Sequence, residues 1–104
     1  MIRLSPMKLF SIPLKREPNR GEVRRVVKVV SREAGLESRE LGTLKAYPGS
    51  LHWHCTMRGR SGTLELTFWP RRGSLWLSVH SRRGAPWVAS AVRRVKAGLA
   101  RRLR

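Results

Sequence analysis

The sequence predicts an α+β fold, a two-layer sandwich in which two helices pack on one face of an antiparallel four-stranded meander sheet. Two observations predict it. The segment between Gly42 and Ser81 alternates apolar and polar residues with a period of two, and a segment of helical periodicity lies on each side of it. The expected order is α-β-β-β-β-α, with an extra N-terminal strand as an open alternative. Because 104 residues suffice for one modest core, we expect a single α+β domain in residues 19–104.

Residues 1–18 are expected to form an N-terminal arm or an edge strand. They are apolar but interrupted by Pro6 and Pro13. The stretch Met7–Ile12 suits an edge strand, where proline is tolerated, or an arm that drapes over the core, and both alternatives stay open. The apolar run in residues 9–14 is too short for a membrane span and does not fit a signal peptide. We therefore expect a cytoplasmic protein with no membrane partner.

Two segments carry the apolar stripe of an amphipathic helix. The first begins with Asn19 and Glu22, which have the spacing of a capping box, and it ends at Gly35. The second begins at Pro86, a residue suited to the first helical position. Their apolar stripes consist of Val23, Val26, Val27, Val30 and Ala34 in the first helix, and of Val88, Ala91, Val92, Val95, Leu99 and Leu103 in the second.

Turn sequences separate four expected strands between the helices. The strands are Thr43–Tyr47, Leu51–Met57, Gly62–Trp69 and Ser74–Ser81. The register implied by the turns pairs Leu44 with Trp53, Ala46 with Leu51, His54 with Glu65, Cys55 with Leu64, Glu65 with Ser78, and Leu66 with Leu77. A slip of one residue would scramble the separation of apolar from polar side chains, so the agreement across three turns is the strongest signal in the sequence.

This register gives the sheet an apolar face and a polar face. The apolar face, expected to form the core, collects Leu44, Ala46, Leu51, Trp53, Cys55, Met57, Leu64, Leu66, Phe68, Leu75, Leu77 and Val79. The polar face, called here the His/Trp face, collects Thr43, Lys45, His52, His54, Thr56, Thr63, Glu65, Thr67, Trp69, Trp76, Ser78 and His80. Cys55 is the single cysteine, and we expect it to be a small buried apolar residue in a reducing compartment.

Net charge is the strongest compositional signal. The chain has 23 Lys and Arg against 6 Asp and Glu, a formal net charge of +17, and such an excess indicates a polyanionic partner, usually nucleic acid or an anionic membrane surface. Codon bias in a GC-rich genome is the alternative, but it would also raise the aspartate content, and the chain has no aspartate. The absence of aspartate and glutamine resembles the composition of heat-adapted proteins, so we expect a thermophilic source.

Three histidines and a glutamate project from the His/Trp face: His52, His54, His80 and Glu65. A His-x-His pair beside a carboxylate on the next strand has the residue types of a zinc site. His80, however, is expected one pair along from the His54–Glu65 row and several ångströms from it. The alternative is a cross-strand His54–Glu65 pair worth about 0.2–1 kcal/mol. From the sequence we assign no metal ligand, no cofactor and no catalytic residue.

Trp69 and Trp76 lie on the same face. Aromatic side chains on an open sheet stack on unpaired bases in several nucleic-acid-binding folds, with basic residues such as Lys45 holding the phosphates. The alternative is that exposed tryptophans form the interface of a homodimer, or that the N-terminal arm covers them.

An anion site is expected at one end of the sheet. Strand direction brings the turn containing Arg58 and Arg60 to the same end as Arg82 and Arg83. The helix that begins at Pro86 starts from this edge with free backbone N–H groups. A phosphate between the four guanidinium groups would relieve their mutual repulsion; the alternative is that they splay into solvent.

The sequence therefore predicts a small basic module that binds RNA or single-stranded DNA, with a role as an accessory subunit of a larger assembly left open. The residues expected to contact nucleic acid are Arg58, Arg60, Arg82, Arg83, Trp69, Trp76, His52, His54, His80 and Lys45. The first alternative is a structural or protein-interaction subunit that oligomerises through the sheet face. The second is a His/Glu hydrolase or metal-dependent enzyme. No small-molecule substrate is inferred.

Overall fold

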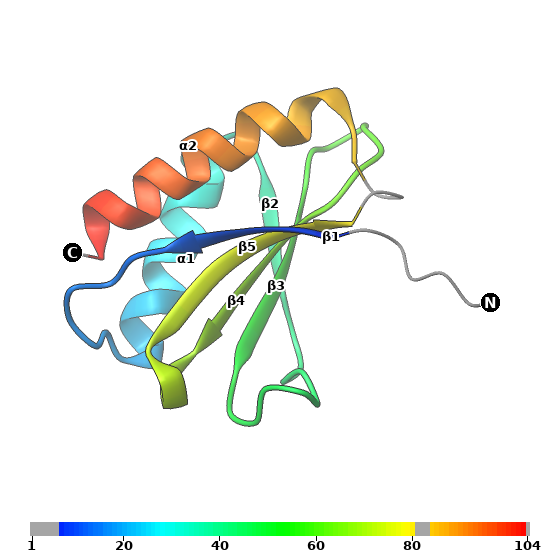
Figure 1. Cartoon of the computed structure of the whole chain (residues 1–104). Helices are drawn as coiled ribbons and strands as arrows, with labels where there is room; N and C mark the ends of the chain where they lie inside the picture. Colours follow the sequence, from blue (N-terminus) through cyan, green and yellow to red (C-terminus); the bar gives the residue numbers. More distant parts are fainter. Residues whose placement is uncertain (1–6, 81–83, 104) are drawn as a thin grey trace.

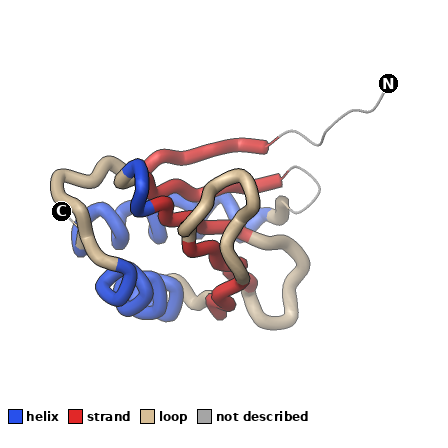
Figure 2. Tube along the Cα trace, turned by 90° about the horizontal axis from the view of Figure 1, so that it is seen from below, coloured by secondary structure: helices blue, strands red, loops and turns tan. Residues whose placement is uncertain are grey.

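The protein forms an α+β sandwich with a five-stranded antiparallel sheet in one layer and two helices in the other (Figures 1 and 2). The structure is a computed structural model and describes residues 7–80 and 84–103. Its elements are β1 (Met7–Ile12), α1 (Arg20–Glu33), β2 (Glu37–Leu41), β3 (Leu51–Thr56), β4 (Leu64–Trp69), the 3-10 turn η1 (Pro70–Arg72), β5 (Ser74–His80) and α2 (Pro86–Arg102). The strand order is β1-β5-β4-β3-β2. The predicted fold class is confirmed, with one strand more than the four of the meander.

The additional strand is the N-terminal one. β1 pairs antiparallel with β5, from Met7 opposite His80 to Ile12 opposite Leu75. It occupies the edge of the sheet, and Pro13 follows directly after its last residue. A proline at this place costs no ladder hydrogen bond, because the strand has already ended.

The prediction of the first strand of the meander, at residues 43–47, is wrong. The strand beside β3 is β2, which pairs Glu40 with Trp53 and Leu41 with His52. The expected strand at residues 43–47 is instead part of a loop over residues 42–50, called here the cover loop. The predicted pairs of Leu44 with Trp53 and of Ala46 with Leu51 are therefore also wrong.

Local hydrogen bonds explain why the cover loop does not extend the sheet. The Thr43 hydroxyl donates to the Ser50 carbonyl at 3.0 Å, and the Leu44 amide donates to the Ser50 hydroxyl at 3.2 Å. These bonds close the loop on itself and use groups that a strand ladder would need. β2 is held instead by its pairing with β3 and by Arg24 of α1, whose Nε donates to Glu40 Oε1 at 2.9 Å.

The remaining register is confirmed. His54 lies opposite Glu65, Cys55 opposite Leu64, Glu65 opposite Ser78, and Leu66 opposite Leu77. The apolar face of the central strands is buried against both helices. The buried apolar side chains of this core include Trp53, Cys55, Leu64, Leu66, Phe68, Leu75 and Leu77 from the sheet and Val23, Val27, Val30, Val88, Ala91, Val95 and Leu99 from the helices.

Cys55 is a buried core residue, as the sequence predicts. Its Sγ lies 3.8 Å from the Ser31 hydroxyl of α1. Burial disfavours the thiolate and raises the pKa of the Cys55 thiol to about 11, although the contact with Ser31 acts in the opposite direction. The thiol therefore stays protonated at neutral pH and behaves as a small apolar side chain.

Both helix starts follow the sequence. The Asn19 side chain accepts a hydrogen bond from the Glu22 amide at 2.8 Å, which caps α1. The Glu22 carboxylate is bound by Arg16. α2 begins at Pro86, and its Trp87 donates from Nε1 to the Ser61 carbonyl at 2.7 Å, which fixes the start of the helix against the β3–β4 loop.

The two helices meet at Gly98 of α2. A Cβ atom at this position would lie 2.9 Å from Cγ1 and 3.2 Å from Cγ2 of Val30 in α1. Since Val30 is β-branched and stiff at χ1, it has little freedom to withdraw. Glycine is thus required here by the close approach of the helices.

We predict that Gly98→Ala destabilises the protein by about 1–3 kcal/mol, because overpacking at the helix contact outweighs the better helix propensity of alanine. Urea unfolding followed by circular dichroism measures this change. Gly21→Ala is the matched control, since a Cβ there meets its nearest atom, Asn19 Oδ1, at 3.4 Å. An equal effect of the two substitutions would contradict the packing argument.

Candidate functional site

Glu65 is the centre of a polar cluster on the His/Trp face. It lies in the central strand β4, opposite His54 of β3 and Ser78 of β5. Side chains two residues apart on a strand share a face, so His52 projects beside His54. The imidazole rings of these two histidines are 5.2 Å apart and lie edge to face, at 77°.

Three histidine nitrogens converge on the Glu65 carboxylate. Nε2 of His52 lies 3.0 Å and Nε2 of His54 lies 3.5 Å from Oε1. Nε2 of His80 lies 3.0 Å from the other oxygen, Oε2. The sequence register put His80 one pair beyond the His54–Glu65 row, and the structure shows that its imidazole spans this offset. All three histidines of the candidate cluster are thus in contact with Glu65.

The cluster is partly removed from solvent. His52 is 4% exposed and Glu65 is 8% exposed, whereas the side chains of His54 and His80 are 27% and 34% exposed. Nδ1 of His52 also lies 2.9 Å from the Thr67 hydroxyl, so both ring nitrogens of this histidine have partners. No buried side-chain nitrogen or oxygen within residues 7–80 and 84–103 lacks a hydrogen-bond partner.

Burial determines the protonation of His52. Desolvation disfavours the imidazolium and lowers the pKa of His52, although the negative charge of Glu65 acts in the opposite direction. His54 and His80 add to the lowering, because a second positive charge nearby is repelled. His52 is therefore neutral at physiological pH, with one ring nitrogen carrying hydrogen and one with a free lone pair.

The second feature of the face is aromatic. Tyr47 of the cover loop packs between Trp69 of β4 and Trp76 of β5, with ring centroids 5.0 Å apart in both pairs and an edge-to-face angle of 68°. Trp69 Nε1 donates to the Pro48 carbonyl at 2.9 Å, and Arg20 of α1 donates to the Gly49 carbonyl at 3.0 Å. The cover loop is thus held from the sheet face and from the helix layer.

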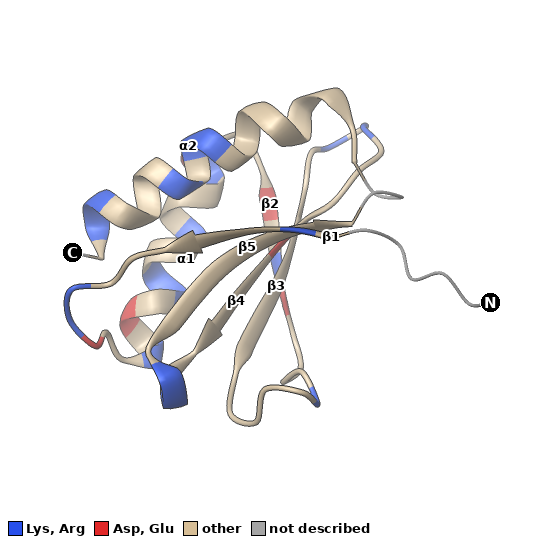
Figure 3. Cartoon of the chain, in the orientation of Figure 1, with Lys and Arg blue, Asp and Glu red and all other residues tan. Residues whose placement is uncertain are grey.

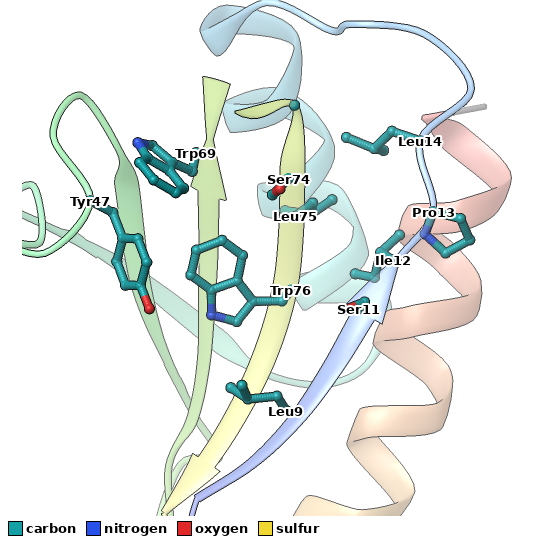
Figure 4. Close-up of a pocket in the computed structure, with 11 residues that line it drawn as sticks. Leu9, Ser11, Ile12, Pro13, Leu14, Tyr47, Trp69, Ser74, Leu75 and Trp76 are labelled. Atoms are coloured by element: carbon teal, nitrogen blue, oxygen red, sulfur yellow. The ribbon is translucent and has the colours of Figure 1, made fainter. Parts of the chain in front are cut away.

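These aromatic rings line one wall of an open pocket of about 420 Å³ (Figure 4). The opposite wall comes from β1 and the residues after it, including Leu9, Pro13 and Leu14. Figure 4 shows Trp76 over the middle of the pocket, with Tyr47 and Trp69 on one side and Leu14 on the other. The volume lies within the range of about 300–1,000 Å³ that is typical of small-ligand sites.

Basic residues flank this aromatic pocket. Arg71 and Arg72 of η1 follow Trp69 directly and are exposed, and the guanidinium carbon of Arg72 lies 5.9 Å from the centroid of the Trp69 ring. Lys45 is exposed on the cover loop. Figure 3 shows lysine and arginine on both helices and on loops at both ends of the sheet, with few acidic residues among them.

The expected anion site at the other end of the sheet is described in part. Arg58 and Arg60 are exposed on the β3–β4 loop, and Arg60 lines a shallow pocket together with Pro86 and Trp87 of α2. The loop therefore lies against the start of α2, as strand direction predicts. Arg82 and Arg83 lie outside the described residues.

The structure adds three residues to the site that the sequence did not assign: Tyr47, Arg71 and Arg72. The two arginines could have been found because they follow Trp69 within a turn that the sequence identifies. Tyr47 was placed in a strand, and its packing on the sheet depends on the path of the cover loop. The sequence predicted that His52 is exposed on the His/Trp face, but the structure shows that its side chain is buried.

Comparison of the chain with protein-family models, curated proteins and solved structures finds no match. Of the two helices in the described part of the chain, neither combines the length and the apolar content needed to cross a bilayer. The function must therefore be argued from the site itself.

We predict that Tyr47→Ala destabilises the protein by about 1–3 kcal/mol, because it removes two aromatic pairs worth about 0.5–1.5 kcal/mol each. Tryptophan emission should also shift to longer wavelength as Trp69 and Trp76 become hydrated. Tyr47→Phe is the control, since it keeps the ring. If Tyr47→Ala unfolds at the same urea concentration as Tyr47→Phe and has the same emission maximum, the aromatic ring does not hold the cover loop.

Proposed function

We propose that the protein binds single-stranded nucleic acid, RNA or single-stranded DNA, through the aromatic pocket of the His/Trp face. The observation that carries the proposal is the position of Trp69 and Trp76, half-buried side by side on adjacent strands and followed by the exposed arginines of η1. Indole rings stack on bases without regard to sequence, at about 1–3 kcal/mol per base. Arginines at the rim supply the phosphate contacts.

The charge of the chain supports the same proposal. Six acidic residues neutralise at most six of the 23 basic residues. Glu22, Glu33 and Glu40 pair with arginines, and Glu65 is enclosed by histidines. The remaining cations repel one another, and a polyanion that neutralises them releases its own counterions on binding.

The burial of the predicted residues reduces the number that can contact nucleic acid. His52 is too deeply buried to reach a ligand on the surface. His54 and His80 are half-buried above it and lie within the same face as the tryptophans. The contacts that support the proposal best are therefore Trp69, Trp76, Arg71, Arg72 and Lys45, with Arg58 and Arg60 at the opposite end of the sheet.

A homodimer is the second candidate, and one observation favours it. Met7 and Leu9 of the edge strand β1 are 48% and 61% exposed. Leu9 lies in the same row as Ser78 and lines the aromatic pocket, so its side chain extends the apolar surface of the His/Trp face. Exposed apolar surface beside an unpaired strand edge is typical of a subunit contact.

Base stacking predicts a change in fluorescence. Adding single-stranded oligonucleotide should quench tryptophan emission, and Trp76→Ala should weaken binding by about 5- to 150-fold, the equivalent of about 1–3 kcal/mol for one stacked base. Trp69→Ala should act in the same direction. If both substitutions leave affinity unchanged and alter only the sedimentation coefficient, the face is a subunit interface and the dimer replaces the proposal.

Salt dependence tests the phosphate contacts with three charge-matched variants. Arg71→Ala/Arg72→Ala and Arg58→Ala/Arg60→Ala should each reduce the slope of log affinity against log salt by about 1.4, since each phosphate contact to a single strand contributes about 0.7. The control is Lys28→Ala/Lys96→Ala, which removes the same charge from the exposed faces of α1 and α2. Equal slopes in all three variants would show unspecific attraction to the whole surface and contradict the proposed interface.

A further inference from the structure

The geometry around Glu65 has a feature that nucleic-acid binding does not explain. Two imidazole nitrogens approach the same carboxylate oxygen, Nε2 of His52 at 3.0 Å and Nε2 of His54 at 3.5 Å. One ligand atom from each of these three residues lies within 4.8 Å of the other two. A carboxylate oxygen accepts two hydrogen bonds, so these contacts satisfy Oε1 in the metal-free protein, and they also bring three potential metal ligands to one point.

Two of these ligand–ligand distances are close to those of a metal coordination sphere. In a tetrahedral zinc site with bonds of about 2.0–2.2 Å, neighbouring ligand atoms are about 3.3–3.6 Å apart, since a tetrahedral edge is about 1.63 times the bond length. The 3.5 Å contact of His54 falls within this range, and the 3.0 Å contact of His52 lies slightly below it. Two histidines and one carboxylate also form a ligand set that leaves further positions open for water or substrate.

We propose that His52 Nε2, His54 Nε2 and Glu65 Oε1 bind one divalent transition-metal ion of the zinc type. The ligands come from adjacent central strands, whose pairing holds them in one row, so the protein does not have to order a loop to form the site. The half-exposed His54 gives the ion a path from solvent to the buried pair.

Two further residues have the contacts of outer-shell partners. The Thr67 hydroxyl lies 2.9 Å from Nδ1 of His52; when Nδ1–H donates to it, the lone pair of Nε2 is free for the metal. His80 contacts Oε2, the carboxylate oxygen that the ion does not need, and fixes the orientation of Glu65. Metal-binding histidines and carboxylates are oriented by partners of this kind in most known sites.

Metal binding does not require unusual protonation states. A metal ion coordinates the neutral imidazole through the ring nitrogen that carries the lone pair. In the metal-free protein each imidazole can donate Nε2–H to Glu65. Binding moves this hydrogen from Nε2 to Nδ1 through exchange with water, and no net proton is released by a neutral ring.

The chain allows a clean test because it contains only three histidines and one cysteine. Protein prepared without a histidine tag and dialysed against a chelator is titrated with Zn²⁺ by calorimetry and with Co²⁺ by visible absorption. We expect one ion per chain and the absorption bands of a low-coordinate Co²⁺ site. His54→Gln should abolish the Co²⁺ bands, and His80→Gln should weaken binding about 10- to 100-fold, as expected for an outer-shell residue.

Cys55→Ala serves as the control, since this thiol is buried on the apolar side of the sheet. Circular dichroism establishes that each variant is folded, and Glu65→Gln provides a second ligand variant if His54→Gln is not. Wild-type protein that forms no 1:1 complex would overturn the proposal, as would unchanged affinity in a folded ligand variant. These titrations contain no nucleic acid, so their outcome is independent of the function proposed above.

Discussion

The pairing of β4 with its two neighbours is the constraint on which the rest of the structure depends. β4 is the central strand, and its alternation sends Leu64, Leu66 and Phe68 into the core while Glu65 and Thr67 face the other way. A slip of one residue would bury the carboxylate among the helices and expose the leucines. The core and the polar cluster are therefore fixed by the same hydrogen-bond ladder.

Burial of Glu65 gives the polar cluster its chemical character. A carboxylate that is 8% exposed requires partners, and among residues 7–80 and 84–103 its ion-pair partners are three histidines. An arginine would form a permanent ion pair. An imidazole has two tautomers and can offer a lone pair to a ligand, which the guanidinium of an arginine cannot do.

The parts of the fold that the sequence predicted are those governed by local periodicity. β3, β4 and β5 follow one another through short turns, so the positions of His54, Glu65 and Ser78 could be worked out from the order of residues alone. Both helix starts also follow from local signals, at Asn19 and Pro86. The turns between these strands and the signals at the helix starts each involve residues that are only a few positions apart in the sequence.

What the sequence did not predict depends on contacts between distant segments. β2 has the sequence Glu-Ser-Arg-Glu-Leu, which lacks alternation because an edge strand that is mostly exposed has little to bury. Tyr47 lies in a stretch that alternates like a strand, yet its ring binds to Trp69 and Trp76 on the sheet face. The contact of His80 with Glu65 depends on side-chain reach across neighbouring rows, which a flat register diagram omits.

The attachment of the cover loop has a consequence for how the two layers communicate. Its Pro48 carbonyl accepts from Trp69 on the sheet face, and the next carbonyl, that of Gly49, accepts from Arg20 at the first turn of α1. The cover loop thus links the two layers, because two neighbouring carbonyl groups accept hydrogen bonds from opposite layers. A molecule that enters the aromatic pocket and displaces Tyr47 would shift the cover loop. Through the hydrogen bond between Arg20 and Gly49, this shift would reach the N-terminus of α1, which the molecule does not touch.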